Sequence, residues 1–124
     1  MRINSAKELK VYQKAYNLAM KIFNFCKTLP KSERYSLTDQ IRRSSRSVCS
    51  NLREAWAKRR YQAHFILKLT DCDGENSETN TWLDFAIDCG YIDFKTHDLL
   101  VKEIDEIGVM LGTMIKTLEG FILK

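Results

Sequence analysis

Residues 65–86 read FILKLTDCDGENSETNTWLDFA, and the architecture of the chain depends on whether this segment forms one helix or two. Its middle, DCDGENS at residues 71–77, has the composition of a turn. An unbroken alternation of four- and three-residue steps nevertheless runs across it, through Phe65, Leu69, Cys72, Asn76, Thr79, Leu83 and Ala86. A loop gives no reason for that alternation to continue, so the spacing predicts one long helix.

The residues after this segment predict a short link and then a last helix. Gly90 suits the left-handed backbone conformation that ends many helices, and Asp93 suits the N-cap of the next one. A heptad pattern of apolar residues then continues to Ile122, which predicts a helix that runs nearly to the end of the chain.

Two amphipathic segments precede residue 65. The first begins near residue 12 and should end at Leu29, because a residue that precedes proline is pushed out of the α region. The second begins at Ser36, which resembles a capping box with Asp39, and continues to the basic cluster at residues 58–60. Together the four segments predict an all-α fold, an antiparallel up-down-up-down four-helix bundle.

Composition agrees with one helical domain over residues 1–124. The chain has one proline and five glycines, too few turn-forming residues for a many-stranded sheet. The four cysteines contain no C-x-x-C pair and only two histidines are present, so we expect no metal and no cofactor. Lysines interrupt the apolar positions near the N-terminus, and the longest uncharged stretch near the C-terminus, residues 107–115, is too short to span a bilayer. We therefore expect a cytoplasmic protein with no membrane partner.

The sign of the charge changes along the chain. Residues 1–70 carry 16 Lys or Arg and 4 Asp or Glu, whereas residues 71–124 carry 4 and 12, so +12 and −8 give the net charge of +4. The two halves could neutralise each other within a subunit, hold neighbouring subunits together, or leave arginines free for a polyanion. These three possibilities frame the functional question.

Four arginines share one face of the predicted second helix. At 100° per residue they lie within about 40° of one another, on the side away from the apolar residues. They are Arg42, Arg46, Arg53 and Arg60. Because the guanidinium fork suits phosphate, we interpret them, with the neighbouring Arg43, as candidate nucleic-acid-binding residues. Trp56 or Tyr61 could stack on a base if the ligand were single-stranded RNA.

A second interpretation assigns these arginines to ion pairs. Asp71, Glu75 and Glu78 share a face of the predicted third helix, and they could pair with the arginines within one subunit or across an interface. Four polar residues are candidates for structural or assembly roles: Asn51, Glu54, Asn76 and Glu78. Asn76, at an otherwise apolar seam, either fixes register as a buried amide or faces a wet lumen.

Four motifs carry a resemblance to a known family. They are ELKVYQKA at residues 8–15, LTDQIRRS at 37–44, SVCSNLRE at 47–54 and GYI at 90–92. With them the chain resembles the four-helix bundle proteins encoded in 23S rRNA intervening sequences. The resemblance implies a bacterial bundle that assembles as a ring, a homopentamer. The chain is also similar to the accessory variability determinant proteins of diversity-generating retroelements, which implies nucleic acid and a reverse transcriptase as partners.

Two functions follow from these patterns, and neither is catalytic, because the chain shows no nucleophile-base pair, metal site or cofactor loop. The first is a homo-oligomeric protein that binds RNA or DNA through arginines of the second helix. The second is a self-assembling structural or protein-interaction module in which the basic half of one subunit meets the acidic half of the next.

Overall fold

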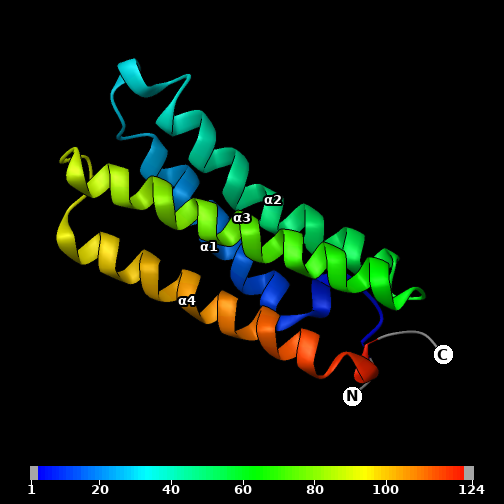
Figure 1. Ribbon diagram of the computed structural model, residues 1–124. Coiled ribbons are helices and arrows are strands. Elements are labelled where there is room, and N and C mark those ends of the chain that lie inside the picture. Colours follow the sequence, from blue (N-terminus) through cyan, green and yellow to red (C-terminus); the bar gives the residue numbers. More distant parts are fainter. Residues whose placement is uncertain (1–2, 122–124) are drawn as a thin grey trace.

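The computed structural model describes residues 3–121, and within that range it contains helices and no strand. The four long helices are α1 (Lys10–Cys26), α2 (Leu37–Ala57), α3 (Gln62–Asp88) and α4 (Phe94–Lys116). Three single 3₁₀ turns accompany them, η1 (Ala6–Glu8), η2 (Lys31–Glu33) and η3 (Leu118–Gly120). Consecutive helices run in opposite directions (Figure 1), which confirms the predicted all-α four-helix bundle.

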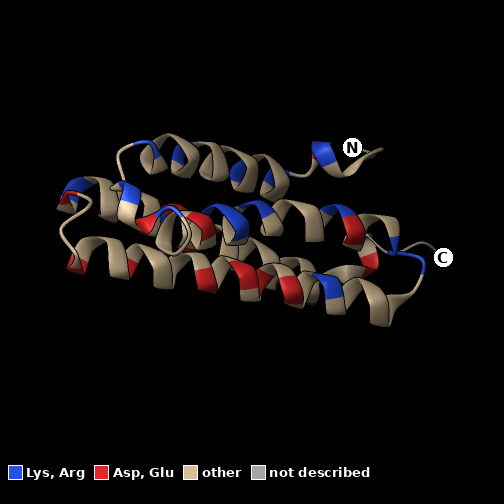
Figure 2. Ribbon diagram, turned by 90° about the horizontal axis from the view of Figure 1, so that it is seen from above, with Lys and Arg blue, Asp and Glu red and all other residues tan. Residues whose placement is uncertain are grey.

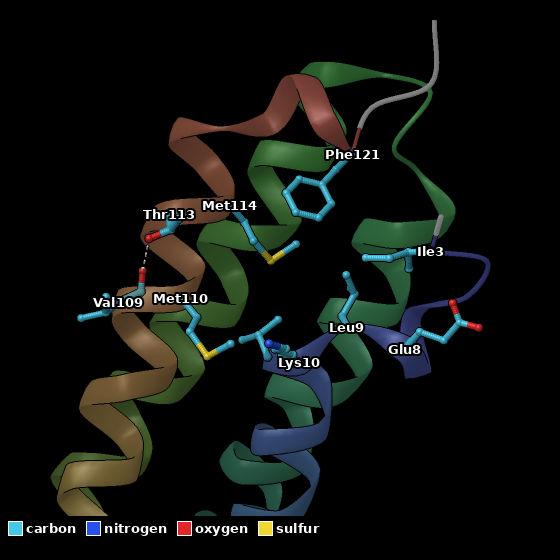
Figure 3. Close-up of a pocket in the computed structure, with 10 residues that line it drawn as sticks. Ile3, Glu8, Leu9, Lys10, Val109, Met110, Thr113, Met114 and Phe121 are labelled. Carbon is cyan, nitrogen blue, oxygen red and sulfur yellow. Dashed lines mark hydrogen bonds between the residues drawn. The ribbon is translucent and has the colours of Figure 1, made fainter. Parts of the chain in front are cut away.

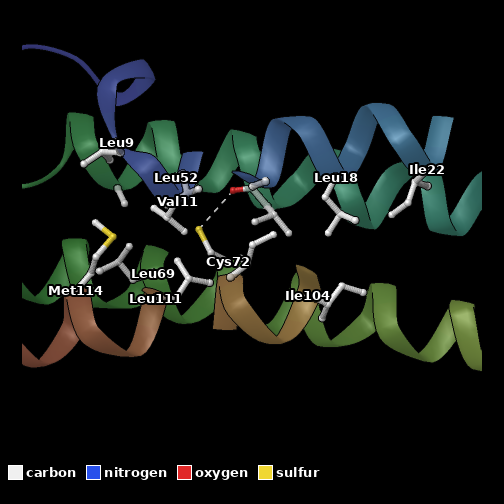
Figure 4. Close-up of a cluster of buried hydrophobic side chains, with 14 of the residues drawn as sticks. Leu9, Val11, Leu18, Ile22, Leu52, Leu69, Cys72, Ile104, Leu111 and Met114 are labelled. Atoms are coloured by element: carbon white, nitrogen blue, oxygen red, sulfur yellow. Dashed lines mark hydrogen bonds between the residues drawn. The ribbon is translucent and has the colours of Figure 1, made fainter. Parts of the chain in front are cut away.

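The helices enclose one hydrophobic core, to which every helix contributes. α2 and α3 form the closest pair, and α1 and α4 complete the ring of helices around the core. Residues that are fully buried, such as Ile22, Ile41, Leu83 and Leu111, come from the apolar stripe of each helix. Figure 4 shows this layer, where the Cys72 thiol also donates a hydrogen bond of 3.5 Å to the Val48 carbonyl.

α3 is continuous through the segment that looks locally like a turn. Its buried residues are the seven whose spacing predicted the helix, and Gly74 lies on the exposed side with nothing near its Cα. Gly90 has φ of 76°, and the backbone N–H groups of Gly90 and Tyr91 donate to the carbonyls of Ile87 and Ala86 at 3.0 and 2.8 Å. Asp93 caps α4 by accepting from the backbone N–H of Thr96 at 2.7 Å. These three predictions are confirmed.

Three predicted helix ends were placed too late. α1 ends at Cys26 instead of Leu29, because the next residues form i→i+3 turns. α2 ends at Ala57, where the backbone of Lys58 already leaves the helical region. α4 ends at Lys116, because Thr117 turns the chain into η3 while its hydroxyl bonds the Thr113 carbonyl at 2.8 Å. The remainder of the predicted last helix, with Ile122, lies outside the described residues.

The predicted capping box at the start of α2 is wrong. Ser36 forms no side-chain cap with α2. Its hydroxyl instead donates to Glu33 Oε1 at 2.6 Å, and the same carboxylate oxygen accepts from the Leu37 backbone N–H at 3.4 Å. The Tyr91 hydroxyl donates to the other oxygen, Oε2, at 2.9 Å. The turn η2 brings Glu33 back over the first N–H groups of α2, so that a glutamate from outside the helix serves as the cap.

This cap predicts a pH-dependent contribution to stability. Hydrogen bonds from Ser36 and Tyr91 lower the pKa of Glu33 below its ordinary value of 4.5. A lowered folded-state pKa means that the contribution is complete above about pH 4.5 and disappears as the pH falls through the folded-state pKa. We expect Glu33→Gln to lower the thermal midpoint by a few degrees at pH 7 and by much less at pH 3.

Thermal melts followed by circular dichroism at both pH values measure this difference. Asp105→Asn is the matched control, because Asp105 is exposed in the middle of α4 and forms no ion pair among the described residues. A Glu33→Gln deficit that is the same at pH 3 and pH 7 would show that the carboxylate is not the capping group.

A small polar layer crosses the otherwise apolar core. The Ser44 and Thr79 hydroxyls lie 2.8 Å apart between α2 and α3, and both side chains are buried. Asn76 is 3% exposed, and its Nδ2 donates to the Ile104 carbonyl of α4 at 2.9 Å. The Asn76 Oδ1 has no hydrogen-bond partner. Asn76 is thus a buried amide that ties α3 to α4, and in this chain it does not face a wet lumen.

Candidate nucleic-acid interface

The basic surface of the bundle is formed mainly by α1 and α2. α1 contains no acidic residue, and Figure 2 shows the basic segments gathered on α1 and along α2, with most acidic segments on the other two helices. Three of the four predicted arginines lie along the edge of α2 that faces α1. We call Arg42, Arg46 and Arg53 the arginine row.

Aromatic rings of α1 support the arginine row. The guanidinium carbons of Arg42 and Arg46 lie 5.2 and 5.8 Å from the centre of the Phe23 ring. The guanidinium carbon of Arg53 lies 5.8 Å from the centre of the Tyr12 ring. Such cation–π contacts hold each guanidinium against an apolar surface while its N–H groups stay available to a ligand.

Positive charge gathers around the ring of Phe23. Lys27 Nζ also lies over this ring, at 4.9 Å from its centre. None of Lys27, Arg42 and Arg46 forms an ion pair with any residue in the range 3–121. Burial raises the pKa of the nearby Cys26 thiol to about 11, although Arg42 and Arg46 act in the opposite direction. Three cations around one ring repel one another, and an anion would relieve that repulsion.

Other cations of the basic half are neutralised within the chain. Lys14 Nζ lies 2.6 Å from Glu106 Oε2, and Lys21 Nζ lies 2.5 Å from Glu103 Oε1, so two ion pairs connect α1 to α4. These pairs lie on the side of α1 that faces α4. The opposite charges of the two halves therefore do meet within one subunit, but they leave the arginine row unpaired.

Arg43 does not belong to the arginine row. It points toward α3, where Nη1 lies 2.9 Å from Glu75 Oε2 and Nη2 bonds Glu78 Oε1. The bond to Glu78 is the main cause that raises the pKa of Arg43, and the same bond lowers the pKa of Glu78. Because one residue along a helix is a 100° turn, Arg43 faces the neighbouring helix while Arg42 faces α1.

The ion-pair interpretation is thus correct for one arginine and wrong for the row within one chain. Glu75 and Glu78 are occupied by Arg43, and Asp71 Oδ2 lies 3.7 Å from Lys68 Nζ. Since α3 packs on the side of α2 away from the row, its carboxylates cannot reach across.

Arg60 lies outside the row, and Trp56 is partly covered. Arg60 follows the end of α2, so it does not continue the row. The indole of Trp56 is half-buried, and the guanidinium carbon of Arg59 lies 3.7 Å from its ring centre while Arg59 Nη1 donates to the Trp56 carbonyl at 2.8 Å. One face of the indole is therefore already covered. Tyr61 is exposed, but its ring contacts His64 at a centroid distance of 5.8 Å.

The remaining polar candidates lie away from the row and have local partners. Asn51 Nδ2 donates to the Ser47 carbonyl one turn earlier, at 2.9 Å. Glu54 Oε2 lies 2.7 Å from Lys68 Nζ, which joins α2 to α3. This contact lowers the pKa of Glu54 and raises that of Lys68. Both residues have structural partners within the subunit, and their part in assembly stays a prediction.

Sequence reasoning missed the aromatic residues of this interface. Tyr12, Tyr16 and Phe23 widen the apolar stripe of α1, and spacing alone does not distinguish them from core residues. In the structure Tyr16 is 52% exposed, and its ring lies 6.3 Å from that of Tyr12 with an angle of 28° between the planes. A hollow of about 460 Å³ adjoins the two rings. Its lining residues are Lys7, Tyr12, Gln13, Tyr16 and Asn17.

The chain is similar to known proteins over most of the bundle. A model of the family described as "23S rRNA-intervening sequence protein" matches residues 7–113. The chain belongs to this family. The matched range includes the whole of α1, α2 and α3, and with them the arginine row and the three aromatic residues of α1.

A solved structure from the S23 ribosomal protein family agrees with this assignment. It is the crystal structure of a protein with unknown function from Bacteroides thetaiotaomicron, which is 32% identical to this chain. The similarity covers 86% of this chain and 95% of that one, with a TM-score of 0.78. No match was found among curated proteins. Family membership therefore establishes the fold, and the function has to be argued from the surface of this chain.

A larger hollow than the one beside Tyr12 and Tyr16 lies elsewhere, and its lining is mainly apolar. It is a groove of about 680 Å³ between the N-terminal segment and the end of α4 (Figure 3), where Leu9, Met110, Met114 and Phe121 contribute apolar surface. At its edge the Thr113 hydroxyl donates a hydrogen bond to the Val109 carbonyl at 3.0 Å. Its lining also includes the polar residues Glu8, Lys10 and Thr113.

No group of three or more His, Cys, Asp or Glu residues in the described part of the chain is placed to hold a metal ion. Within the same residues, no helix is long and apolar enough to cross a membrane.

Proposed function

We propose that this protein is a non-enzymatic, homo-oligomeric nucleic-acid-binding protein of the bacterial cytoplasm, which holds the sugar-phosphate backbone of RNA or DNA on the arginine row. The observation that carries the proposal is the state of the row: three arginines lie on one edge, supported by aromatic rings, without a carboxylate partner among residues 3–121. On the same two helices Lys14, Lys21 and Arg43 form ion pairs, whereas the arginines of the row form none within the described residues.

The geometry of the row suits a chain of phosphates. Arg42 and Arg53 are 11 residues apart on α2, which is roughly 16 Å along the axis at 1.5 Å per residue. Phosphates of one duplex strand advance about 3.4 Å along the helix axis, so the row is long enough to follow several of them. Each guanidinium can donate two parallel hydrogen bonds to one phosphate.

Assembly would multiply this surface. A ring, which we propose to be a pentamer from the family resemblance, repeats the row in every subunit and gains avidity without new contacts. A reverse transcriptase or another protein is a further proposed partner on the same ground.

The experiment that tests the proposal is native mass, measured by light scattering behind a sizing column, at low and moderate salt. Each run is made with and without a mixed pool of structured and single-stranded RNA. We expect an oligomer that binds RNA at low salt and releases it as salt rises. Three phosphate contacts per subunit predict a decrease in log K with log salt of about 2 for single strands. An oligomer whose mass does not change when RNA is added at 50 mM salt would contradict the proposal.

A specific observation also supports the second candidate, a self-assembling interaction module. Asp73, Asp88 and Asp105 are exposed on α3 and α4 and form no ion pair within the described chain, so acidic surface remains beside the basic surface. The row of one subunit could meet these carboxylates in the next. In that case, replacing the arginines of the row with neutral residues would dissociate the oligomer and leave RNA binding unchanged.

A further inference from the structure

We propose that the ligand is a single-stranded nucleic acid, one base of which stacks on Tyr16 in the adjoining hollow. This inference rests on the proposed function, because the arginine row holds the backbone that delivers the base. It adds an identified base-binding position and a preference for single strands over duplexes.

The hollow is continuous with the arginine row. Arg53 lies over the ring of Tyr12, and the ring of Tyr12 lies beside that of Tyr16 with nearly parallel planes. Tyr16 is therefore the next ring after Tyr12 along α1, between Tyr12 and Phe23, and it is 52% exposed. An exposed tyrosine ring that is held by a second ring gives a base a flat and rigid platform.

The hollow also offers hydrogen-bonding groups at the edge of that platform. Its volume of about 460 Å³ lies in the range of small-molecule sites and is large enough for one base. Gln13 Nε2 donates to the Lys7 carbonyl at 3.1 Å, which fixes the side chain and leaves its amide oxygen available. The amide of Asn17 has no hydrogen-bond partner in the described chain. An acceptor, an amide and the Lys7 ammonium could thus meet the edge of a base.

The position of the hollow favours single strands. In a duplex the face of each base is covered by its neighbours, so a side chain can stack on a base only when the base is unstacked. Tyr16 lies on the exposed side of α1, where an unstacked base could reach its ring. Tyr16 and Phe23 are seven residues apart, roughly 10 Å along the axis, so a short strand could place a base and its neighbouring phosphates at the same time.

The other aromatic residues considered for this role fit less well. Trp56 is half-buried and covered on one face by Arg59, and Phe23 is surrounded by three cations. Tyr61 is exposed but lies beyond the end of α2, beside His64. Among these residues Tyr16 combines an open ring with a hollow, and the stacked ring of Tyr12 connects it to Arg53 of the row.

Fluorescence anisotropy at 50 mM salt tests the inference with labelled probes ten nucleotides long. The probes are oligo-uridine, oligo-adenine, their DNA equivalents, an abasic DNA strand and a duplex. We expect the base-bearing strands to bind about 10-fold more tightly than the abasic strand, since stacking on an aromatic ring corresponds to roughly 5- to 100-fold per base. Tyr16→Leu should remove that advantage and leave the abasic strand unaffected, whereas Tyr16→Phe should keep it. Tyr35→Leu is the control, because Tyr35 is 85% exposed in the connector before α2.

The outcomes separate this inference from the proposed function. If Tyr16→Leu binds oligo-uridine as wild type does, while neutralising the arginine row weakens binding, the base position is overturned and the backbone site stands. Equal losses for abasic and base-bearing strands, or a duplex that binds as tightly as the single strand, would also overturn it. If no probe binds the wild type, both proposals fail. Comparing the RNA and DNA probes shows which sugar the site prefers, and either preference agrees with a stacked base.

Discussion

Replacing Arg42, Arg46 and Arg53 together with glutamine is expected to weaken binding of a single-stranded oligonucleotide on the order of 100-fold at 50 mM salt. Each exposed charge-assisted contact to phosphate contributes about 1 kcal/mol, and three of them correspond to roughly two factors of ten. The fold should persist, because the three guanidinium groups lie at the surface and make no ion pair among the described residues. Anisotropy titrations over a series of salt concentrations measure both the loss and its salt dependence.

The salt dependence identifies the contacts as phosphate contacts. Removing three of them should reduce the slope of log K against log salt by about 2 for a single strand. The matched control replaces three exposed lysines of α4, which changes the net charge by the same amount on the other side of the bundle. These are Lys95, Lys102 and Lys116. Equal losses for the two triple variants would mean that binding follows net charge alone and that the row is not a site.

Oligomer mass should be measured on the same two variants. If the arginine variant dissociates while the lysine variant keeps its mass, the row belongs to a contact between subunits, as the self-assembly candidate requires. If both keep their mass and only the arginine variant loses RNA, the row is a surface for an external polyanion. Mass and RNA binding are separate readouts, so one set of variants distinguishes the two functions.

The backbone of the bundle could be predicted because its signals are local. Residue spacing alone identified α3 as continuous, and Gly90 and Asp93 act through bonds to residues three to five positions away. The cap of α2 could not be predicted in the same way. Glu33 reaches the helix only because η2 turns the chain back, and its second partner, Tyr91, comes from the distant link between α3 and α4. A capping box considers only residues that follow the N-cap, whereas Glu33 precedes Ser36 and is held in place by the distant Tyr91.

In the candidate site, too, local features could be predicted and contacts between helices could not. Helical spacing correctly grouped Arg42, Arg46 and Arg53, because three residues on one face depend only on the helix period. The partners of that face depend on which helices lie on either side of α2. Since α1 presents aromatic rings and α3 presents carboxylates, two adjacent arginines, Arg42 and Arg43, have opposite surroundings. The exposure of Tyr16 could not be predicted, because an apolar stripe does not show where its exposed border lies.

The polar layer of the core allows the second prediction, Asn76→Asp, which changes one atom of the side chain. The Asn76 Nδ2 that donates to the Ile104 carbonyl would become a carboxylate oxygen, so two acceptors would face each other at about 2.9 Å in a buried site. The other position, Oδ1, has no donor to stabilise a negative charge. We expect the free energy of unfolding at pH 7 to fall by about 3–5 kcal/mol, the usual effect of a buried charge left without a partner. Domains of this kind are stable by only about 5–15 kcal/mol, so the loss would be severe.

The sign of the pH dependence distinguishes a buried charge from a simple packing defect. Burial should raise the folded-state pKa of the new carboxyl above its unfolded value of about 3.9, so the native state binds the proton more tightly than the unfolded state does. The stability deficit should therefore grow as the pH rises above about 4 and shrink below it, where a protonated carboxyl can donate to the Ile104 carbonyl. Urea denaturation at pH 3.5 and pH 7 measures the deficit, and Asn80→Asp, one turn further along α3 at a half-buried position, is the matched control. A deficit that is equal at both pH values would mean that the loss comes from altered packing and that the amide of Asn76 is not what ties α3 to α4.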